Sequence, residues 1–183
     1  MDVERLEVST DVYVPPEEAY EFLVDFPRYA RYSEYLQAVD QNGDGTPGTE
    51  YALTLAWWRL SYVARSRVTA LDPPTRIDWE LVTDLDATGS WVVEPIQHPE
   101  PPADGEKHEG GRSASRVRLV AEVDVGSADR RALDLPRFVS VGRVVEKVKP
   151  KVVGEAERVV ERIVADLEGQ RREVELRVHE TPL

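Results

Sequence analysis

Hydroxyl-bearing and charged side chains within apolar strands are the groups of this chain best placed for acid–base chemistry. By strand alternation, Tyr51, Tyr62 and Ser66 fall on the same side as the large apolar residues around them. Arg65 and Glu94 would join them only if a β-bulge shifted the register, and two solvated outer-face residues are the simpler interpretation of that pair. These groups could bind a polar part of a ligand or move a proton. They form no recognisable catalytic constellation, so the sequence assigns no catalytic residue.

The common nucleophilic and metal-dependent chemistries lack their residues. The chain has no cysteine, no Gly-x-Ser-x-Gly elbow and no His-Glu-x-x-His helix. His98 and His108 lie in the polar, glycine- and proline-rich stretch 97–114, which predicts a flexible hairpin loop rather than a rigid metal site. His179 lies in the tail. We therefore expect no metal site and no cofactor.

Two glycine-containing patterns between residues 40 and 51 resemble ligand-binding motifs. Residues 40–45 fit the first half of a calcium loop, but Tyr51 stands where the bidentate glutamate is due. Gly43, Gly45 and Gly48 have the spacing of a dinucleotide fingerprint, but a strand rather than a helix is predicted to follow. A solvent-exposed turn is the simpler interpretation of both patterns.

Large apolar side chains fall on one face of successive predicted strands. Apolar and aromatic walls with a few polar tips are typical of a small-molecule cavity. The same side chains could instead pack together as a dry core. The candidate ligand-binding residues are Tyr51, Leu53, Leu55, Trp57, Tyr62, Ser66, Trp79, Trp91, Val93, Val141, Val145 and Val148.

A long amphipathic helix is predicted to form the wall opposite these strands. Apolar residues recur three or four apart through residues 138–167. At ~1.5 Å a residue such a helix reaches ~45 Å, enough to cross a small domain. Pro150 lacks an amide hydrogen, so we expect a kink or a restart there.

The order of elements predicts an α+β fold. A strand at 3–14 precedes two short helices, the second at 28–36, and five strands follow within 49–125, before the long helix. We expect a curved antiparallel sheet of about six strands wrapped around that helix. The chain forms a single domain over 1–183, with a core at 3–168, and the tail at 169–183 suits either a strand or a fraying helix.

Composition limits the partners of the chain. Its 183 residues carry a net charge of −12, which disfavours general attraction to DNA or to an anionic membrane. The N-terminus shows no targeting segment and no apolar run is long enough to span a bilayer, so we expect a soluble, cytoplasmic protein.

The basic residues of the chain are mostly arginines. Only four of the 23 are lysines. This balance is typical of proteins from salt-loving archaea, or of an arginine-codon-rich genome.

Several short phrases occur together in a fixed order. They are VPPEEAYEFL at 14–23, DFPRY at 25–29, GTEY at 48–51, LDPPTRIDW at 71–79 and GSW at 89–91. In these the chain resembles, over residues 3–168, the START-like superfamily of polyketide cyclase/dehydrase and lipid-transport proteins, related to the Bet v 1 fold. The resemblance implies a helix-grip fold with a cavity for a hydrophobic ligand between sheet and C-terminal helix.

Three function classes follow from these patterns and the resemblance. The first is binding or transport of a lipid-like or polycyclic aromatic molecule in that cavity. The second is a polyketide cyclase/dehydrase-type enzyme. The third is a ribosome- or protein-interaction factor of the same fold, for which Lys147, Lys149 and Lys151 offer a basic run, although a solvated helix face explains those lysines equally well.

Overall fold

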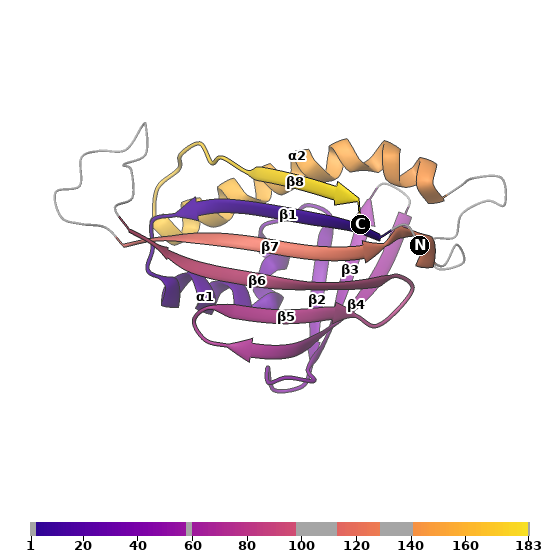
Figure 1. Ribbon diagram of the computed structural model, residues 1–183, viewed down its shortest axis with the longest axis horizontal. Helices are drawn as coiled ribbons and strands as arrows, with labels where there is room; N and C mark the ends of the chain where they lie inside the picture. The colour runs from indigo at the N-terminus through magenta and orange to yellow at the C-terminus, as the bar shows by residue number, and fades with distance from the viewer. Residues whose placement is uncertain (1–2, 58–59, 98–112, 129–140, 183) are drawn as a thin grey trace.

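The main element of the structure is one antiparallel sheet of eight strands (Figure 1). The computed structural model describes residues 3–57, 60–97, 113–128 and 141–182. The strand order is β2-β3-β4-β5-β6-β7-β1-β8. The strands are β1 (Val3–Val12), β2 (Leu36–Asn42), β3 (Glu50–Trp57), β4 (Leu60–Asp72), β5 (Arg76–Leu81), β6 (Asp86–Ile96), β7 (Ala114–Asp124) and β8 (Arg177–Pro182).

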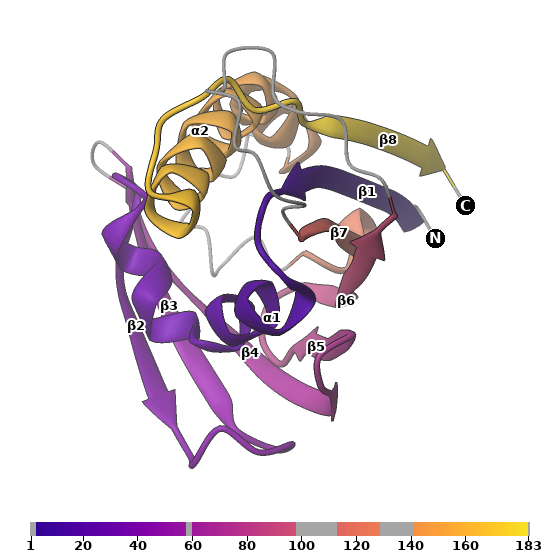
Figure 2. The ribbon, with the colours of Figure 1, turned by 90° about the vertical axis from the view of Figure 1, so that its left-hand side faces the viewer.

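The sheet curves around the helices and leaves its two edges apart. In Figure 2 it bends from β2 and β3 through β5 to β1 and β8, and α2 (Val141–Glu168) lies across the opening. α1 (Pro16–Val24) and the 3₁₀ helix η1 (Phe26–Arg31) follow β1, and a second 3₁₀ helix, η2 (Val125–Ser127), follows β7. This arrangement confirms the predicted helix-grip α+β fold. Of the described helices, none is both long and apolar enough to cross a membrane.

The prediction of about six strands was wrong, because β2 was missed and the tail that forms β8 was left open between a strand and a fraying helix. Residues 28–36 were predicted as a helix, but η1 ends at Arg31 and β2 begins at Leu36. β2 ends in exposed polar residues and pairs only with β3, so its alternation of apolar and polar residues is weak. β8 pairs with β1 and carries mostly exposed side chains. Edge strands need bury little, and their sequences therefore resemble loops.

The long helix was predicted with nearly its observed ends. α2 runs from Val141 to Glu168 without a break at Pro150, so the expected restart does not occur. Residues 138–140 lie outside the described residues, as does most of the predicted loop at 97–114. β7 begins at Ala114, the last residue of that predicted loop.

The strand register defines which side chains face inward, because antiparallel partners point to the same side of a sheet. Val68 pairs with Trp79, and Ile77 pairs with Trp91. Ile77 is fully buried and Val68 is 1% exposed, which identifies this face as the core side. The alternation predicted for residues 62–68 holds, and a register shift follows between Val68 and Ala70.

Aromatic side chains of α1, η1 and β3 form a cluster that fills one end of the space between the sheet and α2. α1 begins at Pro16 with two acidic residues in its first turn, as helix N-termini favour. The ring of Phe22 stacks on Tyr29 with centroids 5.8 Å apart, and that of Phe26 lies 4.7 Å from Tyr51. The C-terminal half of α2 packs on this cluster, where Val164 is 1% exposed.

Buried ionic contacts hold the end of α2 against β1 and the tail. The Glu168 carboxylate has no exposed surface and accepts the backbone N–H of Tyr13 at 2.9 Å. Arg172 donates to both of its oxygens, at 2.7 and 2.8 Å, and to the carbonyl of Asp11 at 2.9 Å. The segment after α2 is therefore part of the folded domain.

A second set of polar contacts joins α2 to η1 and to the residue that follows it, Tyr32. Asp166 accepts hydrogen bonds from Arg28, at 2.8 Å, and from the hydroxyl of Tyr32. Arg162 donates to the carbonyl of Tyr32 at 2.6 Å. Together with the Glu168 contacts, these bonds fix α2 at both borders of the opening in the sheet.

Candidate functional site

The predicted ligand-binding residues of the strands share the inner face of the sheet wherever their side chains are described. Tyr51, Leu53 and Leu55 alternate along β3, and Tyr51 pairs with Ser66 while Leu55 pairs with Tyr62. Ser66 in turn pairs with Leu81 on β5. The same register continues to the inward residues of β5 and β6, which are Trp79, Trp91 and Val93.

Part of this face is packed core. Tyr51 and Val93 are each 2% exposed and belong to the buried cluster, and Leu53 and Trp91 pack against it. Phe26 and Tyr29, which both lie in η1, complete this packing. The dry-core alternative therefore describes the α1 end of the face.

Trp79 packs closely against Gly89, its partner on β6. A Cβ atom on Gly89 would come within 2.3 Å of Cζ2 of Trp79 and 2.8 Å of the carbonyl oxygen of Val120. Only glycine leaves room for the indole there. Glycine is thus required at the first position of Gly89-Ser90-Trp91 by the packing of Trp79, which the sequence alone did not reveal.

The opposite end of the inner face is open. Leu55 is 36% exposed although it points to the same side as buried Tyr51. Its partner Tyr62 is half-buried and donates its hydroxyl to Asp84 at 3.3 Å. Figure 1 shows α1 near one end of the long strands and the β5–β6 turn at the other. The apolar face is therefore sealed beside α1 and accessible near this turn.

Four of the predicted residues cannot be placed as side chains. Trp57, Val141, Val145 and Val148 belong to described backbone of β3 and α2, but their side chains lie outside the described residues. Their part in lining a cavity stays a prediction.

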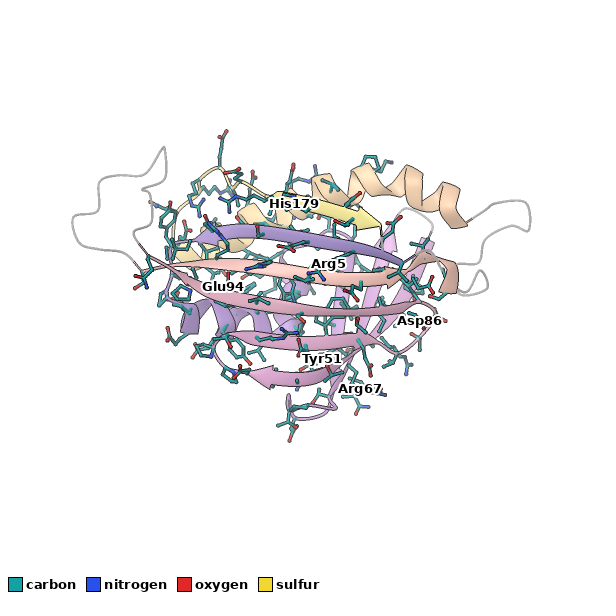
Figure 3. All side chains as sticks on the ribbon, viewed as in Figure 1. Arg5, Tyr51, Arg67, Asp86, Glu94 and His179 are labelled. Atoms are coloured by element: carbon teal, nitrogen blue, oxygen red, sulfur yellow. The ribbon has the colours of Figure 1, made fainter. Side chains whose placement is uncertain are left out.

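The Arg65–Glu94 pair considered in the sequence analysis does not form. Both residues are exposed, and Glu94 pairs with Arg118 at 2.5 Å. Figure 3 shows Glu94 and Arg5 on the outer face of the sheet, among other charged side chains. The solvated outer-face interpretation is the correct one, because no bulge turns either residue inward.

The inner-face hydroxyls are held in their protonated form. Burial, together with the nearby charge of Asp25, raises the pKa of Tyr51, and burial together with Asp84 raises the pKa of Tyr62. Burial likewise raises the pKa of Tyr29 far above its usual value. At neutral pH these phenols can donate hydrogen bonds, but none is poised as a general base.

No metal-ligand cluster of three or more His, Asp or Glu residues occurs in the described parts of the chain. His98 and His108 lie outside those parts, and His179 is exposed on β8. The glycine-rich stretch after Asp40 forms a turn, in which Asp44 accepts a hydrogen bond from the backbone N–H of Thr46. Gly43, Gly45 and Gly48 all have positive φ angles there.

A charged surface pocket of about 370 Å³ lies beside the C-terminal part of α2, lined by Arg158, Glu161, Arg162, Ala165, Arg171 and Arg172. Arg158 pairs with Glu155, Arg162 with Glu34, and Arg172 with Glu168. Three of the four guanidinium groups that line the pocket are therefore already paired with carboxylates.

Comparison with solved structures shows the same fold at low sequence identity. The aromatase/cyclase Zhui from Streptomyces sp. R1128 matches with TM-score 0.63 and 13% identity, over 91% of this chain and 94% of that one. A START superfamily protein from Mycobacterium smegmatis matches with TM-score 0.60 and 15% identity, over 90% and 99%. The di-domain aromatase/cyclase StfQ of the steffimycin biosynthetic pathway matches with TM-score 0.59 and 13% identity, over 91% of this chain and 50% of that one.

Sequence comparison gives the family directly. No curated protein matches the chain. The family model for polyketide cyclase / dehydrase and lipid transport matches residues 4–168, which span β1 to the last residue of α2. The chain therefore belongs to the polyketide cyclase/dehydrase and lipid-transport family.

Proposed function

We propose that the protein binds a hydrophobic small molecule, lipid-like or polycyclic aromatic, between the inner face of the sheet and α2. The observation that carries the proposal is the exposure of Leu55 on a largely apolar face that is buried only at its α1 end. Covering such a face with an apolar ligand is favourable, by about 25 cal/mol for each Å² of apolar surface removed from water. Family membership and the fold of the two cyclases support the same conclusion.

Two alanines, one on each face of the sheet, allow a matched test. Ala64 pairs with Leu53 on the inner face, and Ala52 pairs with Arg65 on the outer face. We expect Ala64→Trp to fill the space and weaken binding of pyrene by about 10-fold or more, as overpacking by a large side chain displaces a guest. Ala52→Trp should bind as the unaltered protein does.

Pyrene fluorescence titration measures both affinities, and circular dichroism checks that each variant is folded. If Ala64→Trp unfolds, Ala64→Leu gives a smaller and graded loss. Equal weakening by both tryptophans, or failure of the unaltered protein to bind pyrene, would contradict the proposed site.

Cyclase/dehydrase chemistry on a polyketide-like ring is the second candidate. The hydrogen bond between Tyr62 and Asp84 favours it, because it places a carboxylate beside the open end of the apolar face. Tyr51 and Ser66 are the other hydroxyl-bearing residues on this face that the sequence pointed to.

The third class, a ribosome- or protein-interaction factor, rests on Lys147, Lys149 and Lys151 and stays a prediction. The absence of DNA binding also stays a prediction.

We further propose that the acidic composition is an adaptation to a salt-rich cytoplasm. With 35 acidic and 23 basic residues, the folded chain repels itself, and salt screens that repulsion. The melting temperature should therefore rise by several degrees between low and molar KCl. Calorimetry at matched pH tests this expectation, and a melting temperature that stayed constant or fell would exclude a halophilic origin.

A further inference from the structure

The open end of the inner face carries a small group of polar atoms that the packing of the core does not explain. Thr83 and Asp84 lie in the turn between β5 and β6, just beyond Leu81, which pairs with inward-facing Ser66. Tyr62 reaches Asp84 from β4. Leu55, the exposed apolar residue of this end, pairs with Tyr62.

The hydroxyl of Thr83 has no hydrogen-bond partner although its oxygen is buried. A buried, unsatisfied hydroxyl costs about 1–3 kcal/mol. The two other buried polar atoms of the described chain without partners, on Tyr20 and Arg28, belong to α1 and η1. Thr83 is thus the one that lies in the β5–β6 turn, at the open end of the face. Its oxygen is covered in this structure, so a ligand atom would reach it after the side chain rotates about χ1.

The backbone of Asp84 is held in an unusual conformation. Its φ angle of 67° makes it the one non-glycine residue with left-handed backbone in the described chain. Such a conformation costs energy for a residue with a Cβ atom, and aspartate tolerates it better than most. Here it accompanies the contact between the Asp84 carboxylate and the Tyr62 hydroxyl.

We propose that Tyr62, Thr83 and Asp84 bind a neutral hydroxyl group of the hydrophobic ligand. The proposal rests on the proposed binding function and specifies its ligand as an apolar alcohol or phenol. Thr83 offers a donor without an acceptor, while the oxygen atoms of Tyr62 and Asp84 accept. A hydroxyl group matches this set because it both donates and accepts.

Other polar groups fit less well. A ketone or ester carbonyl accepts only, so it satisfies Thr83 but leaves the oxygen atoms of Asp84 and Tyr62 facing a second acceptor. A carboxylate or phosphate would stand beside the Asp84 carboxylate, and like charges at close range repel. The apolar body of the ligand would then extend from this polar end toward Trp79 and Trp91.

Three pyrene derivatives test the assignment by fluorescence titration at pH 7. We expect 1-hydroxypyrene to bind about 10-fold more tightly than pyrene, which is the effect of about one well-made buried hydrogen bond. Pyrene-1-carboxylate should bind no better than pyrene. Thr83→Val and Tyr62→Phe should each reduce the ratio of the affinity for 1-hydroxypyrene to the affinity for pyrene to near unity, whatever each change does to the affinity for pyrene itself.

Thr54→Val is the matched control, because Thr54 pairs with exposed Val63 on the outer face. It should keep the full preference. If pyrene binds but 1-hydroxypyrene gains nothing, or if Thr83→Val and Tyr62→Phe keep the preference, the hydroxyl site is wrong and the binding function stands. If pyrene-1-carboxylate binds as tightly as 1-hydroxypyrene, selection of a neutral group is wrong. If no pyrene derivative binds, the proposed function itself fails.

Discussion

Glu168→Gln is expected to destabilise the protein by about 3–5 kcal/mol, the usual cost of leaving one member of a buried ion pair uncompensated. The Glu168 carboxylate is fully buried, and its partner Arg172 is only 10% exposed. Without the negative charge, the guanidinium would remain largely out of water with carbonyl oxygens as its main acceptors. Urea unfolding followed by circular dichroism measures the change in free energy.

The same helix provides the control. Glu161 is exposed, and Glu161→Gln should change stability by less than about 0.5 kcal/mol. Replacing Glu168 and Arg172 together by methionine should recover much of the loss, because apolar replacements of a buried pair leave no unpaired charge. Equal stability of Glu168→Gln and Glu161→Gln would show that the pair does not hold the tail.

Gly89→Ala should cost about 2–3 kcal/mol, at the upper end of what overpacking by small groups costs. The added methyl group would meet both the indole of Trp79 and the backbone oxygen of Val120, and the backbone cannot move without disturbing β7. The indole must therefore leave its position. We expect a lower unfolding midpoint in urea and a red shift in tryptophan emission.

Gly154→Ala tests whether this loss arises from crowding. Gly154 lies within α2 and a Cβ atom there meets nothing within 4 Å, so alanine should stabilise the helix by about 0.5–1 kcal/mol. Adding Trp79→Leu to Gly89→Ala should cost less than the two changes made separately, since the clash is then removed. Additive losses would mean that Trp79 and Gly89 act independently.

The strongly periodic elements could be predicted from sequence because burial on one side determines their pattern. α2 repeats its apolar residues every three or four positions, and β3 and β4 alternate, so their inward faces followed directly. β2 and β8 could not be predicted in this way. Both are edge strands with largely exposed side chains, and what defines them is pairing to β3 and β1.

The candidate site shows the same limit. The apolar side chains of β3, β5 and β6 were identified, but the accessible end was not, because exposure depends on how the curved sheet meets α2. Thr83 and Asp84 appeared to be ordinary turn residues. Tyr62 lies 22 positions from Asp84, and no local spacing rule relates the two.

β8 has a consequence for the limits of the domain. The family model ends at residue 168, whereas the polypeptide adds its outermost strand only at Arg177–Pro182. A protein cut after residue 168 would expose the backbone hydrogen-bonding groups of β1 along one edge of the sheet, and an unpaired edge strand can pair with strands of other molecules. The folded unit, which includes β8, is therefore longer than the segment that the family model matches.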